Sequence, residues 1–376
     1  MPLTPAQRRQ LRRDCTLIVP GFAHLTAAQE FRAMADWCEA QGTEHDLYGQ
    51  GDLVEGFEGK IARLLGKPAA VFMPSGIMAQ AVAVKLWTEG AGLPRFGLHP
   101  TSHLLLHEEQ AHDALLHCHA VPLGDRLRPL LASDLQACAQ ALACVIVELP
   151  IREAGGQLPS WDELQALKAE ARQRDLRLHM DGARLWESAP HYGKTPAEIA
   201  EGFDSVYVSV YKGIGALSGA LLVGGDDFIA NARLWRRRLG GTLYHLSPMV
   251  VSAAMRFDER LAWMPGLYQR ARDLAAGLAG VPRLRLNPAT PQTPMLHLFF
   301  DAPADAVLEA RDALAAGTGC WLVDGVRPAE VPGWSVSELT VGDRLLNTGA
   351  ADNARIVALF AQLCDTLSTH PEPPSP

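Results

Sequence analysis

Two stretches of the chain decide its fold: HMDGARLWESA at residues 179–189 and DSVYVSVYKGIGALSGALLVG at residues 204–224. Residues 176–180, LRLHM, are typical of one strand, and the alternating DSVYVSVY of the second stretch is typical of another. The first strand leads into Asp181 and the second into Lys212. Because ligands of α/β proteins collect at the carboxyl ends of the strands, we expect both side chains at one ligand site.

The rest of the chain also indicates an α/β fold. Proline and glycine residues separate short apolar runs from amphipathic helices in alternation. Residues 143–147, ACVIV, read as a buried strand, which favours a parallel sheet. Ser160 and Glu163 have the spacing of a capping box, so we expect a helix from there to about Arg174.

The pattern changes after the Gly240-Gly241 turn, where helices with only a few strands follow. This change predicts a second, smaller α+β domain that contains a strand at residues 295–300 and ends with a helix over residues 353–367. The predicted division is an amino-terminal segment at 1–40, a large domain at 41–255, a small domain at 256–370 and a disordered tail at 371–376.

Composition excludes several classes of function. The 376 residues are 48% hydrophobic, which is enough for a large core, and the net charge of −8 carries no basic footprint for nucleic acid or an anionic membrane. No apolar run is as long as a membrane span. Seven scattered cysteines without a CxxC pair favour reduced thiols and a cytoplasmic enzyme. Adjacent residues such as His117, Cys118 and His119 point to different sides of a strand, so we predict no metal site.

Asp181 and Lys212 suit the chemistry of pyridoxal 5′-phosphate (PLP). That cofactor needs a lysine for a Schiff base and an acid that pairs with its pyridine nitrogen, because a protonated ring withdraws electrons from Cα more strongly. A phosphate turn is predicted at PSGI, residues 74–77, between an apolar segment and a helical one. Ser75 and Gly76 would hold the phosphate there. The GIGALSG run is no dinucleotide fingerprint, since its last glycine comes one place too late.

With these motifs in order, the chain resembles the threonine aldolase/β-eliminating lyase family of fold-type I PLP enzymes. The resemblance spans roughly residues 44–250. It implies a large domain with a mostly parallel seven-stranded sheet, and a homodimer or homotetramer with sites at subunit interfaces. The matching stretches are HDLYGQGDLVEGFEGKIARLLGKPAAVFMPSG, SHLLLHEE, EAGGQLP, HMDGARLWESA, DSVYVSVYKGIGALSGALLVG and RRRLGG.

The resemblance also implies roles for individual residues. Lys212 matches the Schiff-base lysine and Asp181 the partner of the pyridine nitrogen. His103, in SHLLLHEE, matches the histidine that stacks on the cofactor ring near the β-hydroxyl of the substrate. Arg184 matches a residue that contacts the substrate carboxylate, a task that suits the planar guanidinium fork.

Some positions depart from the family pattern. Ile77, the third residue of the phosphate turn, stands where the family usually has a phosphate-binding threonine, and Tyr244 stands where an arginine normally follows the glycine turn. Leu149-Pro150 replaces the usual Asn-Thr. Near the carboxyl end, Arg344 is our candidate for a second arginine that binds the carboxylate.

The leading functional hypothesis is a lyase that cleaves the Cα–Cβ bond of a β-hydroxy-α-amino acid to give glycine and an aldehyde. A second hypothesis is β-elimination or other chemistry at Cα of a different amino acid. A third, of another class, is a PLP-binding protein without catalysis. The predicted ligands are PLP and a small amino acid.

Overall fold

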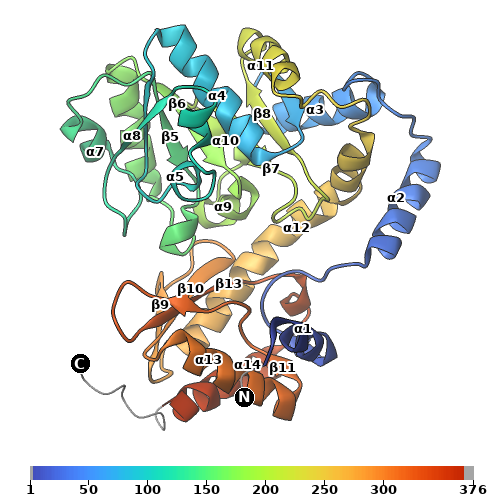
Figure 1. Ribbon diagram of the computed structural model, residues 1–376, viewed down its shortest axis with the longest axis vertical. Coiled ribbons are helices and arrows are strands. Elements are labelled where there is room, and N and C mark those ends of the chain that lie inside the picture. Colours follow the sequence, from blue (N-terminus) through green and yellow to red (C-terminus); the bar gives the residue numbers. More distant parts are fainter. Residues whose placement is uncertain (1–2, 368–376) are drawn as a thin grey trace. The chain divides into compact units, whose positions relative to one another are not determined.

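The structure, a computed structural model, describes residues 3–367 (Figure 1). It divides into two compact units, and the predicted tail at 371–376 lies outside the described residues. The large unit comprises residues 25–153 and 157–262, and the small unit comprises residues 3–24, 154–156 and 263–367.

The boundaries of the units differ from the predicted ones. At the amino end, β1 (Leu17–Ile18) pairs in parallel with β11 (Cys320–Trp321), so the first residues belong to the small unit and the large unit begins at Leu25. At the other boundary the large unit extends to Ala262, because α12 (Ser247–Leu278) runs through the predicted boundary without a break.

A seven-stranded sheet forms the centre of the large unit, as predicted. The order is β2-β8-β7-β6-β5-β3-β4, and all neighbours run parallel except β8, which is antiparallel to both β2 and β7. The strands are β2 (Ala69–Met73), β3 (Arg95–Leu98), β4 (His119–Pro122), β5 (Cys144–Glu148), β6 (Arg177–Gly182), β7 (Ser205–Ser209) and β8 (Ala220–Gly224). The central strands are buried almost throughout, which explains their continuous apolar runs.

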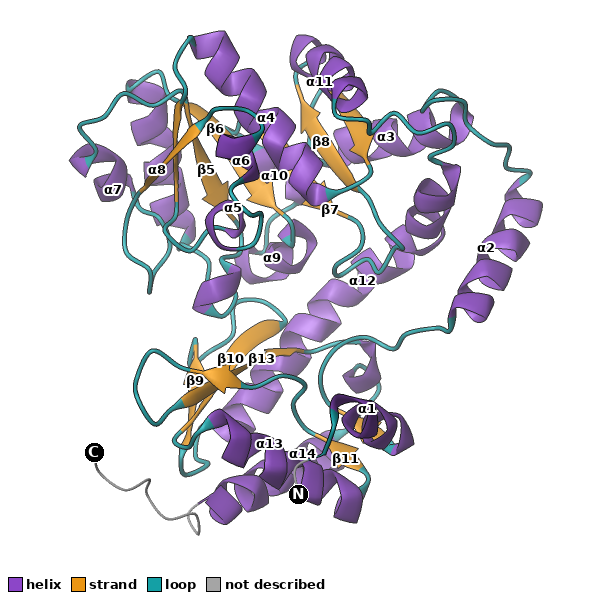
Figure 2. Cartoon of the chain, viewed as in Figure 1, coloured by secondary structure: helices purple, strands orange, loops and turns teal. Residues whose placement is uncertain are grey.

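Helices pack against this sheet (Figure 2), and α4 contacts most of its strands. The capping box at Ser160 is confirmed: its hydroxyl accepts a hydrogen bond from the N–H of Glu163, and the helix ends at the cap residue Arg174. The helices of the large unit are α2 (Ala27–Gln41), α3 (Asp52–Leu64), α4 (Gly76–Ala91), α5 (His103–Leu106), α6 (Ala111–Ala114), α7 (Ala132–Ala137), α8 (Trp161–Gln173), α9 (Leu185–Tyr192), α10 (Pro196–Ala200) and α11 (Asp226–Arg238).

The small unit has its own sheet and core. Four antiparallel strands lie in the order β12-β13-β10-β9, which confirms the strand predicted at residues 295–300. The strands are β9 (Leu284–Asn287), β10 (Met295–Phe300), β12 (Arg327–Pro328) and β13 (Ser335–Thr340), and the helices are α1 (Pro5–Asp14), α13 (Ala304–Thr318) and α14 (Ala350–Leu367). Two short 3-10 helices are η1 (Arg152–Ala154) and η2 (Asp343–Leu345). Across residues 3–367, none of the helices combines the length and the apolar character needed to span a membrane.

Candidate active site

Asp181 and Lys212 lie close together in the large unit. Asp181 is in register with Glu148 of β5 on one side and Tyr207 of β7 on the other, and only 3% of its surface is exposed. Lys212 follows the end of β7 at Ser209. Each of the two charges acts on the other: burial raises the pKa of Asp181 while Lys212 lowers it, and burial lowers the pKa of Lys212 while Asp181 raises it. The structure therefore brings the two residues together at one edge of the sheet.

Arg184 lies within the electrostatic reach of this pair. It is the cap residue of α9, three residues after Asp181, and its charge contributes to lowering the pKa of both Lys212 and Glu148. Sequence reasoning had assigned Glu148 no role. Burial, with the charge of Asp181, raises the pKa of Glu148 to about 8, and among residues 3–367 its Oε2 has no hydrogen-bond partner. Two buried carboxyl groups, Glu148 and Asp181, thus lie side by side, and each has its pKa raised by burial.

His103 is held by a carboxylate that sequence reasoning missed. It is the first residue of α5, and its Nδ1 lies 2.9 Å from Oε1 of Glu108. Glu108 is buried; burial raises its pKa, and the bond to His103 opposes that rise. Asp181 and Lys212 also influence this pKa, so the histidine–glutamate pair belongs to the same site. The only sequence signal for Glu108 was its place in SHLLLHEE.

The predicted phosphate turn lies at the start of α4. The Ser75 hydroxyl accepts a hydrogen bond from the N–H of Met78 at 3.2 Å, which caps the helix. Gly76 has no room for a side chain, because a Cβ there would collide with the hydroxyl of Tyr207 and lie 3.2 Å from that of Tyr211. The Ile77 side chain is 42% exposed. Two tyrosine hydroxyls therefore meet the phosphate turn, and sequence reasoning had assigned neither a function.

A buried polar network supports the strands below these groups. His179 of β6 contacts Ser205 through Nδ1 and Gln80 of α4 through Nε2, both at 2.8 Å. Trp87 of α4 donates its indole N–H to the same Ser205 hydroxyl at 2.8 Å. Burial lowers the pKa of His179 to about 3, so its ring is neutral and can accept at one nitrogen and donate at the other. The network fixes α4, which carries the phosphate turn, to the strand that carries Asp181.

Arg344, the candidate second arginine, lies in η2 of the small unit. Burial lowers its pKa, and the charges that act on it come from the same unit. Its predicted role at the site stays a prediction. Within residues 3–367 no group of three or more histidine, cysteine, aspartate or glutamate side chains is arranged to hold a metal ion.

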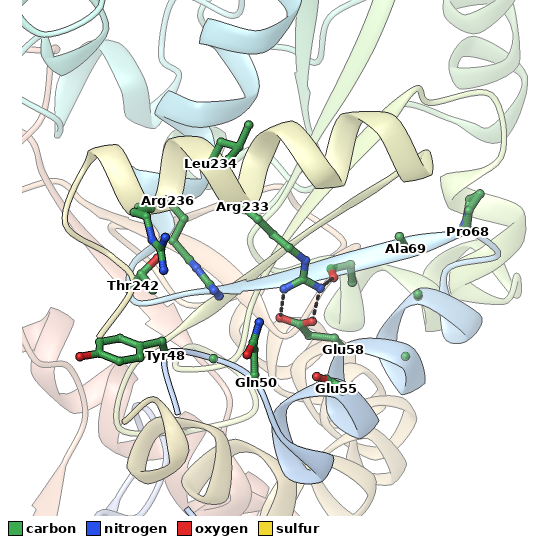
Figure 3. Close-up of a pocket in the computed structure, with 15 residues that line it drawn as sticks. Tyr48, Gln50, Glu55, Glu58, Pro68, Ala69, Arg233, Leu234, Arg236 and Thr242 are labelled. Atoms are coloured by element: carbon green, nitrogen blue, oxygen red, sulfur yellow. Dashed lines mark hydrogen bonds and ion pairs between the residues drawn. The ribbon is translucent and has the colours of Figure 1, made fainter. Parts of the chain in front are cut away.

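A separate cavity of about 600 Å³ lies beside α3, β2 and α11 (Figure 3). None of the predicted catalytic residues lines it. Glu58 accepts hydrogen bonds there from the Phe72 N–H at 2.7 Å and from the guanidinium of Arg233, which also donates to the Ala70 carbonyl at 3.0 Å. Arg236 donates to the Phe72 carbonyl at 2.8 Å. These side chains hold the outer edge of β2, the strand that leads into the phosphate turn.

Comparisons with known proteins identify relatives of this chain. The family model described as β-eliminating lyase matches residues 26–300. A solved structure of a provisionally named L-allo-threonine aldolase from Listeria monocytogenes is 34% identical, with a TM-score of 0.88 over 96% of this chain and 99% of that one. Low-specificity L-threonine aldolase 1 of Arabidopsis thaliana is 25% identical over 276 residues, which are 70% of this chain and 76% of the relative.

More distant solved structures share the fold alone. One of them, a structure of the protein called SPT with the PLP internal aldimine, is 15% identical, with a TM-score of 0.68 over 94% of this chain and 88% of that one. That protein holds PLP, the cofactor that the sequence of the present chain leads us to expect.

The residues present fit that cofactor on three observations. Lys212 is a partly buried lysine whose pKa is lowered by burial, which favours the neutral amine that reacts with an aldehyde. Asp181 is a buried carboxylate at a strand end, where a cationic ring nitrogen would compensate its charge. Ser75 and Gly76 stand at the start of a sixteen-residue helix, whose first N–H groups attract an anion such as a phosphate. PLP would thus be held at its aldehyde by Lys212, at its ring by Asp181 and at its phosphate by the turn at Ser75 and Gly76.

Proposed function

The chain belongs to the β-eliminating lyase family, and on this basis we propose that it is a PLP-dependent lyase that cleaves β-hydroxy-α-amino acids to glycine and an aldehyde. The observation that carries the proposal is the convergence of Lys212, Asp181, Arg184 and the His103–Glu108 pair at one edge of the sheet. The two threonine aldolases named above give the substrate class.

Each residue has a task that its surroundings suit. PLP, when bound, supplies the electron sink for the electrons left at Cα. Lys212 holds the cofactor covalently, and its lowered pKa makes the neutral amine easier to regain after each turnover. Asp181 keeps a proton on the pyridine nitrogen, because a buried carboxylate without a cation beside it would be costly.

Arg184 binds the substrate carboxylate and so fixes which bond at Cα is aligned for cleavage. The charge of Arg184 acts on both Asp181 and Lys212, which supports this role. A guanidinium binds a carboxylate through two parallel hydrogen bonds, which restrains rotation better than a single contact.

His103 removes the proton from the β-hydroxyl, either directly or through a water molecule. Its Nδ1 is occupied by the buried Glu108 at 2.9 Å, so Nε2 is the nitrogen left to accept that proton. The Glu108 carboxylate fixes the tautomer of His103 and stabilises the positive charge that develops on its ring. A carboxylate hydrogen-bonded to Nδ1 of a catalytic histidine generally has these two effects.

We further propose a cytoplasmic homo-oligomer, a dimer or tetramer, with its sites at subunit interfaces. All seven cysteines are free, which suits a reducing compartment. Large apolar side chains around the site, including Ile77 and Tyr211, are more than a third exposed in the single chain, and a second copy would cover them. Sedimentation of the purified protein tests the assembly, and a monomer at micromolar concentration would refute it.

A panel of amino acids tests the reaction itself. The purified protein is loaded with PLP and incubated with both stereoisomeric series of threonine and allo-threonine, with serine and with phenylserine. Release of glycine and the matching aldehyde in equal amounts supports the proposal. An oxo acid and ammonia would instead indicate β-elimination, and bound PLP without any product would indicate a binding protein. Lys212→Ala serves as the control for cofactor-only chemistry in solution.

A further inference from the structure

The phosphate turn lacks a hydroxyl at its third position. Ile77 can offer only its backbone N–H there, where the family usually has a phosphate-binding threonine. The N–H groups of the first helical turn have no partner inside the helix, and they attract anions. A side-chain donor at the same place would add to both affinity and orientation.

Two tyrosines reach this turn: Tyr207 lies in β7, and Tyr211 is the second residue after that strand. Tyr207 is in register with Asp181, so its side chain leaves the sheet on the same face, and it is 3% exposed. Its hydroxyl lies against the position that a Cβ of Gly76 would take, and the hydroxyl of Tyr211 lies 3.2 Å from that position. Both hydroxyls thus border the same point beside Gly76, and the nearby Tyr211 contributes to raising the pKa of Tyr207.

Tyr211 also connects the turn to the reactive lysine. It directly precedes Lys212, whose Nζ lies 5.8 Å from the centre of the tyrosine ring. The loop that follows is tied to the turn as well, because the Ser218 hydroxyl donates to the Pro74 carbonyl at 2.7 Å. Lys212, the phosphate turn and the two tyrosine hydroxyls thus lie in one region of the large unit.

We propose that the hydroxyls of Tyr211 and Tyr207, together with the N–H groups at the start of α4, bind the phosphate of PLP and replace the hydroxyl that Ile77 lacks. The inference rests on the proposed cofactor, but it is independent of the reaction that the enzyme catalyses. Burial raises the pKa of Tyr207 well above its usual value, so this hydroxyl stays a donor across the physiological pH range. Gly76 is then required because any side chain would displace the Tyr207 hydroxyl.

The test compares PLP with pyridoxal, which has the same ring and aldehyde but no phosphate. Tyr211→Phe, Tyr207→Phe and the double variant are prepared as full-length protein, and dissociation constants are measured by spectroscopic titration. Each single variant should bind PLP about tenfold or more weakly, since a hydrogen bond to a charged group is lost. Affinity for pyridoxal should stay within about twofold of the parent.

Two further variants make the comparison specific. Tyr192→Phe is the matched control, because this tyrosine donates its hydroxyl to the Pro159 carbonyl and lies outside the site; it should leave the affinity for PLP unchanged. Ile77→Thr in the Tyr211→Phe background should recover part of the lost affinity, since it returns a hydroxyl to the turn. Circular dichroism verifies that each variant is folded. If Tyr207→Phe is unfolded, the test rests on Tyr211→Phe, because Tyr211 is partly exposed.

The outcomes are distinct. An equal loss of affinity for PLP and pyridoxal would overturn the inference, because the tyrosines would then shape the ring site and not the phosphate site. Unchanged PLP affinity in the double variant would overturn it as well. A parent that binds PLP but cleaves no β-hydroxy amino acid would refute the proposed function and leave the phosphate inference standing, whereas a parent that does not bind PLP would refute both.

Discussion

Glu108→Gln tests the assigned role of the histidine most directly. In the parent, a buried carboxylate lies 2.9 Å from Nδ1 of His103, and the substitution keeps the shape of the side chain while it removes the charge. A hydrogen bond to a charged group contributes about 1.5–3 kcal/mol, and one between neutral groups about 0.5–1.5 kcal/mol. The difference, about 1–2 kcal/mol, corresponds to a fall of about 5- to 30-fold in kcat/KM for a β-hydroxy amino acid.

The same variant should alter the dependence of activity on pH. Burial raises the pKa of Glu108, so its carboxylate is protonated at a higher pH than an exposed glutamate. As the pH falls through this raised pKa, the parent should lose the charge behind His103 and with it activity. Glu108→Gln has no such proton to gain, so this step on the acid side should be missing from its profile.

The assay is initial rates over a range of pH on protein saturated with PLP, with cofactor content measured on the same preparation. A neighbouring pair gives the control: Glu153→Gln, whose carboxylate lies 2.9 Å from Nε2 of His107, removes a similar charge from a histidine without an assigned role. Its kcat/KM should remain within about twofold of the parent. If Glu108→Gln also stays within twofold and keeps the acid-side step, Glu108 does not act on the reaction through His103.

Three further substitutions address the other site residues. Lys212→Ala should abolish the PLP adduct that borohydride traps on the parent, and a persistent adduct would place the attachment on another lysine. Asp181→Asn should still bind PLP but lose about 10- to 100-fold in turnover, since a charge-assisted bond worth about 1.5–3 kcal/mol is removed; turnover within threefold of the parent contradicts the assignment. Arg184→Lys keeps the charge without the planar fork, and kcat/KM toward α-amino acids should fall by one to two orders of magnitude, about 1.4–2.8 kcal/mol. PLP titration of that variant distinguishes a substrate ligand from a cofactor ligand. If the variant no longer binds PLP, Arg184 contacts the cofactor and not the substrate carboxylate.

The sequence predicts what is local in this structure. The strands before Asp181 and Lys212, the helix capped at Ser160 and the α/β class follow from periodicity and capping residues, and the observed elements confirm them. The seven strands were implied by the family resemblance and not by composition. Position along the chain was enough to suggest that Asp181 and Lys212 share a site, because parallel strands end at the same edge.

Partners that depend on register could not be predicted in the same way. Glu108 lies two residues beyond the end of the short helix α5 and contacts His103 at its start, and periodicity carries no information on that contact. The approach of Tyr207 to Gly76 depends on the place of β7 in the strand order, and on how α4 packs across the sheet. The pairing of β1 with β11 joins residues about three hundred positions apart, so no local sequence pattern predicts it.

The side chains that hold β2 have a consequence for assembly. β2 is the last strand of its sheet, and such a strand ordinarily offers free N–H and C=O groups to any extended chain that approaches it. Here the Phe72 N–H donates to Glu58, and the carbonyls of Phe72 and Ala70 accept from Arg236 and Arg233. Charged side chains thus form the hydrogen bonds that a further strand would otherwise make. We therefore do not expect copies of this protein to join by extending the sheet at β2, and an oligomer would associate through other surfaces.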